Sequence, residues 1–197
     1  EAIINAQDYA MGVDPGVFLL GEDIGDPPGG VFKTTAGLQT KWGKERVRPT
    51  PIAEQAIIGA ATRAALVGMR PVAEIMFCDF IGVTMDQITN HAAKQRYMSG
   101  GATNVPMTMR ILCAGGLGGF GAQHSQSLES WLLHVPGLKV VYPSTTLDAR
   151  GLLTSCIFDE DPCVHLESMA LLFSAPKQDV PLGDYRIPLG VAKVRRE

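Results

Sequence analysis

Several common kinds of protein are excluded by what the 197-residue sequence lacks. No apolar run reaches the roughly 18 residues that a membrane-spanning helix needs. The net charge is only −3, so no excess of positive charge points to nucleic acid or to an anionic membrane as a partner. No Gly-x-Ser-x-Gly sequence is present, which argues against a hydrolase built around a serine nucleophile.

Cysteine is scarce and scattered. The four cysteines, at positions 78, 113, 156 and 163, include no Cys-x-x-Cys pair. We expect them to be reduced, mostly buried thiols of an intracellular protein. A hydrophobic share of 46% and a charged share of 19% are typical of a globular domain rather than of a disordered or fibrous chain.

What the sequence does contain is an alternation of short apolar runs with longer helical patterns. This order predicts an α/β fold with a mostly parallel six-stranded sheet and helices on both faces. The predicted strands are 17–20, 46–48, 72–76, 107–112, 139–142 and 163–167. The predicted helices are 1–11, 52–67, 80–98, 127–134 and 146–158.

Such a sheet binds ligands beyond the carboxyl ends of its strands, which points to particular loops. A proline-rich segment of weak periodicity, 174–197, is expected to be a linker that leaves a domain spanning 1–173. The loops expected to form the site are 21–35, 49–54, 77–80 and 114–127.

Glu54 is the first candidate for chemistry. Thr50 and Pro51 are predicted to start a helix, with Thr50 as its cap and Pro51 in its first position. Glu54 follows in the first turn, ahead of a stretch of Ala, Ile, Gly and Leu that predicts a helix buried on most sides. A lone carboxylate there either binds a ring nitrogen of a ligand or faces solvent and complements the helix dipole.

Other residues near Glu54 and in the next predicted helix have ordinary structural explanations. Small residues recur at Ala56, Ala60 and Ala64, and the smooth face they form fits a subunit contact or close packing inside the domain. At the start of the next predicted helix, Asp79 can serve as a cap and Phe80 can belong to the core.

A glycine-rich loop from Gly116 to Gly121 fits the spacing of a dinucleotide-binding fingerprint. The fingerprint also needs an acidic residue at the end of the next strand and a helix directly after the glycines, and both are missing here. We therefore favour a loop that presents His124 and keep a nicotinamide-dependent oxidoreductase as a minor alternative. A lone loop histidine, taken by itself, is more often a surface or structural residue.

Cys163, His165 and Glu167 alternate along one predicted strand and so share a face, a spacing that can hold a transition metal. An ordinary buried strand after the turn at Asp161 and Pro162 is the stronger interpretation.

Several blocks of sequence, taken in order, resemble one family. They match the β subunits of the thiamine-diphosphate-dependent first components of 2-oxo acid dehydrogenases, which act on pyruvate, branched-chain 2-oxo acids or, in one branch, acetoin. The similarity runs from about residue 5 to the tail, and residues 77–83 and 185–188 look most like the acetoin branch. The matching blocks include 21–24 (Gly-Glu-Asp-Ile), 50–54 (Thr-Pro-Ile-Ala-Glu), 70–77 (Arg-Pro-Val-Ala-Glu-Ile-Met-Phe), 96–101 (Arg-Tyr-Met-Ser-Gly-Gly), 124–127 (His-Ser-Gln-Ser) and 136–141 (Pro-Gly-Leu-Lys-Val-Val).

This resemblance implies a transketolase-like pyrimidine-binding fold, with thiamine diphosphate shared between this β subunit and an α subunit that holds its diphosphate and Mg²⁺. Glu54 occupies the position of the carboxylate that bonds N1′ of the cofactor's aminopyrimidine, and His124 that of the histidine near the substrate and lipoyl group. Phe80 and Met76 match the lining of the pyrimidine pocket, and Glu22 matches an acid in the passage between paired active sites.

The resemblance also implies a structural potassium ion held mostly by main-chain oxygens, and a hard cation prefers oxygen ligands. Solvated acids at a helix end are the alternative. The matching positions are Val105, Met107, Thr108, Cys156, Asp159 and Asp161.

The implied partners are the α subunit, in an α2β2 assembly, and the lipoyl-bearing dihydrolipoyl acyltransferase core. The family's β subunit continues into a C-terminal domain, so we expect this chain to belong to a longer polypeptide and to be inactive without its α subunit. It would lie in the cytoplasm of a bacterium or in the mitochondrial matrix of a eukaryote. A non-catalytic subunit-interaction domain is the main alternative, and the substrate stays open.

Overall fold

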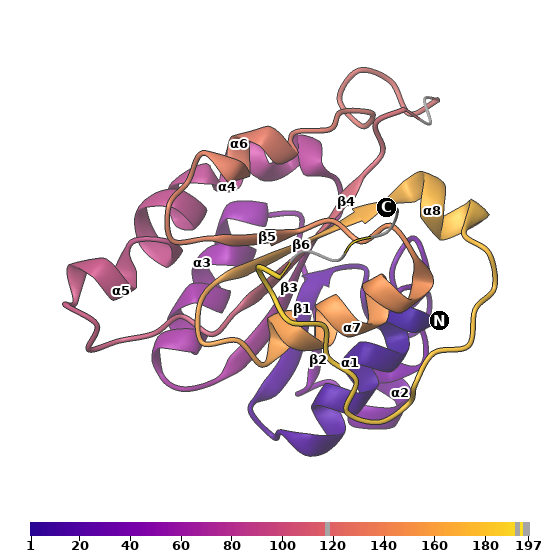
Figure 1. The fold of residues 1–197 in the computed structure, drawn as a ribbon, viewed down its shortest axis with the longest axis horizontal. Coiled ribbons are helices and arrows are strands. Elements are labelled where there is room, and N and C mark those ends of the chain that lie inside the picture. Colours follow the sequence, from indigo (N-terminus) through magenta and orange to yellow (C-terminus); the bar gives the residue numbers. More distant parts are fainter. Residues whose placement is uncertain (117–118, 192–193, 195–197) are drawn as a thin grey trace.

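Six strands form one fully parallel sheet in the order β2-β1-β3-β4-β6-β5 (Figure 1). The computed structural model describes residues 1–116, 119–191 and 194. All six predicted strands and the α/β fold are confirmed, and each strand end lies within two residues of its predicted position. The strands are β1 (Val17–Glu22), β2 (Val47–Thr50), β3 (Arg70–Ile75), β4 (Thr108–Cys113), β5 (Lys139–Val141) and β6 (Cys163–Ser168).

Helices cover both faces of the sheet, as predicted (Figure 1). Alternate residues of β1 show why, because successive side chains of a strand point to opposite faces. Phe18 and Leu20 pack in the core beneath α3, whereas Val17 and Leu19 pack in the core beneath α1. The first face carries α3 (Glu54–Leu66), α4 (Ile81–Asp86) and α6 (Glu129–Leu133), and the second carries α1 (Ala2–Val13) and α7 (Thr146–Ile157).

Some helix predictions were wrong. Thr50 does not cap a helix, because it still belongs to β2, where it pairs with Glu22 of β1. The helix begins only at Glu54, after an N-cap at Ala53 whose side chain makes no capping bond. The predicted helix 80–98 is four short pieces: a 3-10 turn (Cys78–Phe80), α4, a π-helical segment (Gln87–Ala92) and α5 (Gln95–Met98). Two short helices were missed, α2 (Leu38–Trp42) and α8 (Met169–Ser174).

The segment after residue 174 packs along α7. Arg150 Nη2 donates to the carbonyl oxygens of Leu182 and Gly183 at 3.3 and 2.9 Å, and Ser155 Oγ donates to that of Ile187 at 2.6 Å. A Cβ at Gly151 would meet the Ile187 side chain at 2.7 Å, so only glycine lets the tail lie this close. Its role as a linker stays a prediction.

The remaining general expectations concern cysteines, small residues and membranes. All four cysteines are free and buried, as predicted. Of the three small residues, Ala56 and Ala60 are exposed, so close packing inside the domain does not explain them, whereas Ala64 is half-buried against the core. None of the helices in the described part of the chain is long and apolar enough to cross a membrane.

Candidate functional site

Two carboxylates meet at the carboxyl edge of the sheet. Glu22 ends β1, and Glu54 begins α3 directly after the neighbouring strand β2. Both residues are buried, with only 7% and 8% of their surface exposed. Among the described residues, neither carboxylate accepts a hydrogen bond or forms an ion pair, and Glu22 Oε1 is fully enclosed. Burial, together with the negative charges of Glu54, Asp23 and Glu74, raises the pKa of Glu22 to about 7.

Buried carboxylates without partners lower the stability of the folded state. A buried polar atom without a partner loses its hydration without compensation, and two acids in proximity oppose each other's ionisation. Groups of this kind are rare in folded proteins and concentrate at functional sites. Glu22 and Glu54 at this edge are therefore our candidate site. Only 8% of the surface of Glu54 is exposed, which argues against the interpretation that its side chain extends into solvent.

His124 and Phe80, both predicted site residues, lie in contact next to this edge. The His124 ring stands edge-to-face against Phe80, with centroids 5.2 Å apart, and against Phe77, with centroids 5.0 Å apart. Phe32 and Phe120 contact Phe77 from other sides, so Phe77 is the centre of the aromatic cluster and, of the described aromatic rings, only those of Phe77 and Phe80 touch the imidazole. This geometry fixes the plane of the histidine ring.

Met76, the other predicted pocket residue, is half-buried in the same apolar group as Phe77 and Phe80. It also lines a cavity of about 10 Å³ with Phe32 and Glu74. The structure thus gathers the predicted residues into two pairs, Glu22 with Glu54 and Phe80 with His124, which follow strands that lie side by side.

The loop that carries His124 is tied to the segment that carries Phe80. Asp79 Oδ1 accepts hydrogen bonds from the main-chain N–H of Gln126 at 3.3 Å and from its side-chain Nε2 at 2.8 Å. Cys78 Sγ donates to the Gln126 carbonyl oxygen at 2.8 Å. Asp79 is therefore not the helix cap that it resembled in sequence. Neither it nor Gln126 was predicted as a site residue.

The described residues around the glycine-rich loop argue against a dinucleotide-binding turn. Leu117 and Gly118 lie outside the described residues, and Gly116, Gly119 and Gly121 all have positive φ. The next helix, α6, begins only at Glu129, whereas a dinucleotide fingerprint leads its glycines straight into a helix N-terminus. The geometry therefore gives the nicotinamide alternative no support.

A buried ionic network lies under the site. Arg110 on β4 donates to both oxygens of Glu167 at 2.7 and 2.8 Å and to Glu74 Oε2 at 2.7 Å. Burial alone would raise the pKa of Glu167, but the charges and hydrogen bonds of Arg110 and His165 together outweigh burial and lower that pKa to about 2. Burial raises the pKa of Glu74, which has a single bond to the guanidinium. Charged residues inside otherwise apolar strands were the signal for this network.

The same network bears on the predicted alternative metal site. His165 Nδ1 lies 3.4 Å from Glu167 Oε1, yet both oxygens of Glu167 are engaged by Arg110. The Cys163 thiol donates instead to the Asp161 carbonyl oxygen at 3.5 Å. Within the described ranges, no three His, Cys, Asp or Glu side chains are grouped to hold a metal.

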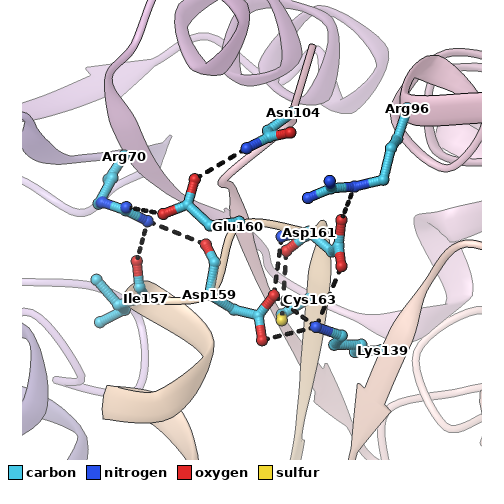
Figure 2. A network of polar contacts seen from close by, with 9 residues as sticks. All are labelled: Arg70, Arg96, Asn104, Lys139, Ile157, Asp159, Glu160, Asp161 and Cys163. Atoms are coloured by element: carbon cyan, nitrogen blue, oxygen red, sulfur yellow. Dashed lines mark hydrogen bonds and ion pairs between the residues drawn. The ribbon is translucent and has the colours of Figure 1, made fainter. Parts of the chain in front are cut away.

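The positions that match a potassium site lie at the opposite, amino edge of the sheet, where their acids have cationic partners (Figure 2). Lys139 Nζ bonds both oxygens of Asp159 at 2.7 and 2.8 Å and lies 3.2 Å from Asp161 Oδ2. Arg96 Nε donates to Asp161 Oδ1 at 2.6 Å.

Some of the oxygen atoms at the predicted potassium positions already accept hydrogen bonds, and others do not. The carbonyl oxygens of Val105 and Met107 accept from Met107 N and Cys163 N, and Cys156 is buried. The hydroxyl of Thr108 is enclosed and has no hydrogen-bond partner in the described chain. These oxygens suit a hard cation, while the two carboxylates are already neutralised. The potassium ion stays a prediction.

A family model described as "Transketolase, pyrimidine binding domain" matches residues 1–173. The chain belongs to this family. Over its full length, this pyrimidine-binding domain is 45% identical to the mitochondrial 2-oxoisovalerate dehydrogenase subunit beta of Dictyostelium discoideum and 47% identical to the pyruvate dehydrogenase E1 component subunit beta of Acholeplasma laidlawii. It is 46% identical to the acetoin:2,6-dichlorophenolindophenol oxidoreductase subunit beta of Cupriavidus necator. The chain spans 52%, 59% and 60% of the lengths of these three relatives.

Solved structures share the fold at lower identity. A split-gene transketolase, described as an inactive beta4 tetramer, superposes with a TM-score of 0.70 at 22% identity, covering 95% of this chain and 55% of that one. Transketolase from Leishmania mexicana gives a TM-score of 0.67 at 17% identity, covering 84% of this chain and 25% of that one. The predicted transketolase-like fold is confirmed.

Proposed function

We propose that this chain is the cofactor-activating part of the β subunit of a thiamine-diphosphate-dependent 2-oxo acid or acetoin dehydrogenase. The observation that carries the proposal is the pair of buried carboxylates, Glu22 and Glu54, that find no partner within the described protein. The names of the relatives support the reaction class, since each is a β subunit of such an enzyme.

The residues present fit the pyrimidine end of thiamine diphosphate. The Glu54 carboxylate needs a hydrogen-bond donor, which a protonated ring nitrogen supplies. Phe80 and Met76 offer apolar surface for the ring beside it. When bound, the cofactor supplies the electron sink that cleavage next to a carbonyl requires. The α subunit would hold its diphosphate and Mg²⁺.

Each residue then has a distinct task in handling protons. Glu54 would share a proton with the ring nitrogen and so favour the reactive tautomer of the pyrimidine. Glu22, with a pKa near 7, can hold a proton or release one close to neutral pH, and its charge acts on Glu54. His124, with its ring plane fixed by Phe77 and Phe80, would orient the substrate or donate a proton to it. The acyl group would then pass to a lipoyl group of the acyltransferase core.

The test is a reconstituted complex with the α subunit, assayed with acetoin, pyruvate and branched-chain 2-oxo acids and an artificial electron acceptor. Glu54→Gln should lower kcat by about 100-fold or more, because the ring nitrogen loses its carboxylate partner. Glu45→Gln is the matched control, since that side chain is 94% exposed, and it should leave the rate unchanged.

Near-normal turnover of Glu54→Gln would overturn the assigned role. A wild-type complex that binds no thiamine diphosphate would favour a non-catalytic interaction domain instead. Titration of the chain with NADH, followed by fluorescence, should show no binding, and saturable binding would revive the nicotinamide alternative.

A further inference from the structure

Phe77 and Phe80 set the plane of the His124 ring, but the position of the residue depends on the loop that carries it. Within the described chain, its ring has aromatic contacts but no hydrogen bond to another side chain. Its main-chain N–H donates to the Gly121 carbonyl oxygen at a long 3.3 Å. The surrounding segment, from residue 114 to residue 128, contains no helix or strand among its described residues. Something else must therefore fix where the imidazole stands.

Gln126, two residues further on, is held on three of its polar groups. Asp79 accepts from its main-chain N–H and its side-chain amide, and Cys78 donates to its carbonyl oxygen. The bond from the amide to the carboxylate is charge-assisted, which makes it stronger and more directional than a neutral one. We call these three bonds the Gln126 clasp.

The clasp joins the two segments that carry the site. Asp79 lies directly before Phe80, after β3, and Gln126 lies two residues after His124, after β4. The clasp therefore fixes the distance between the chain at Phe80 and the chain at His124, whose rings meet at 5.2 Å. The two ends of the loop, at Gly115 and Ser127, also lie close together. A Cβ at Gly115 would lie 2.0 Å from Ser127 Oγ, so a larger residue does not fit there.

We propose that Asp79 and Gln126 are positioning residues, which hold His124 edge-on to Phe80 so that its ring nitrogens face the reacting groups. This inference rests on the proposed function for its catalytic consequence, though not for its structural one. Asp79 is half-buried and Gln126 is exposed, so removing the clasp should displace the loop without unfolding the domain.

The structural arm of the test uses the chain alone. Phe77 and Phe80 shift the His124 ring-proton signals in an NMR spectrum of histidine-labelled protein, and His124→Gln identifies them. Asp79→Ala and Gln126→Ala should each move these signals toward the values of a free histidine. The control is Asp86→Ala, which removes a similar exposed bond, from Asn90 Nδ2 at 2.8 Å, outside the loop. It should leave the His124 signals in place.

Two further variants separate positioning from general stability. Asp79→Asn keeps a carbonyl oxygen that can accept both bonds, so it should retain the signals. Gln126→Glu places a second carboxylate against Asp79 and should release the loop by repulsion. The double variant Asp79→Asn with Gln126→Glu restores a donor and an acceptor in swapped places and should recover the signals.

The catalytic arm uses the reconstituted complex with the α subunit. Asp79→Ala and Gln126→Ala should lower kcat by about 10- to 100-fold with little change in KM, because a misplaced group harms the reacting geometry more than substrate binding. Asp79→Asn and the swapped double variant should recover the rate.

The outcomes are distinct. Unchanged His124 signals in both alanine variants would overturn the clasp. Displaced signals with full turnover would overturn its role in the reaction and leave the proposed function intact. An inactive wild-type complex would count against the proposed function, while the NMR arm would still decide whether the clasp orients His124.

Discussion

Two pairs of acidic residues, one at each edge of the sheet, behave in opposite ways. At the carboxyl edge, Glu22 and Glu54 are buried and have no partner in the described chain. At the amino edge, Asp159 and Asp161 bond to Lys139 and, for Asp161, to Arg96 (Figure 2). The paired acids hold segments together, whereas the unpaired acids cost stability, and groups of this kind concentrate at functional sites.

The largest expected loss of stability comes from removing the cation that pairs with the buried acids, which would leave them without a partner like those at the carboxyl edge. Arg110→Met would leave Glu74 and Glu167 buried without their cation, and should lower the free energy of unfolding by about 3–5 kcal/mol. Urea denaturation at pH 7 measures this. Arg63→Met, at an exposed position on α3, is the control and should change little. A loss below about 1 kcal/mol for Arg110→Met would show that the interior acids need no partner.

A smaller change in stability is expected from replacing Glu22 at the carboxyl edge with a neutral residue. The pKa of Glu22 is raised from 4.5 to about 7, so the folded protein holds this proton more tightly than the unfolded chain does. Its ionisation therefore costs folding stability increasingly between pH 4.5 and pH 7, and the full cost is present above pH 7. Glu22→Gln should be more stable than the wild type by about 1–3 kcal/mol at pH 8, and the difference should vanish near pH 4.

Unfolding free energies across this pH range, with Glu45→Gln as the exposed counterpart, check this prediction. A stability difference that did not change with pH would mean that Glu22 titrates normally and that the carboxyl edge is not electrostatically strained.

The smallest effect is expected at the amino edge. Lys139 is 41% exposed. Burial alone would lower its pKa, but its hydrogen bonds to Asp159 and Asp161 and their charges outweigh burial and leave the pKa raised. Because solvent screens such a pair, Lys139→Met should cost about 1 kcal/mol or less, and the loss should shrink further in 1 M salt. Lys44→Met, at an exposed position, is the reference. A loss of several kcal/mol that salt did not reduce would contradict the contrast between the edges.

The strands and the loops that carry the candidate site could be predicted because they depend on short, local sequence patterns. Apolar runs located all six strands, and the carboxyl ends of those strands pointed to the loops that carry Glu22, Glu54, Phe80 and His124. The helix start at Thr50 failed because pairing with Glu22 keeps that residue in β2, a tertiary contact that overrides capping preference.

Other features depend on which residues far apart in the sequence become partners. The Asp79–Gln126 pair is separated by 47 residues, and Arg110 lies 57 residues from Glu167, so only the folded chain brings these partners together. The interruption of the predicted helix 80–98 by a π-helical segment was also not predicted, because the segment contains no proline or glycine to mark a break. The roles of Glu54, His124 and the potassium positions in a reaction stay predictions.

The unpartnered carboxylates have a thermodynamic consequence that reaches beyond chemistry. A molecule that supplies the donor missing at Glu54 binds the folded chain and not the unfolded one, so it must raise the melting temperature by mass action. At a concentration 100 times its Kd, such a compound adds about 2.7 kcal/mol to the free energy of unfolding. Thermal shift against a panel of aminopyrimidines thus becomes a binding assay for this domain that requires neither substrate nor turnover.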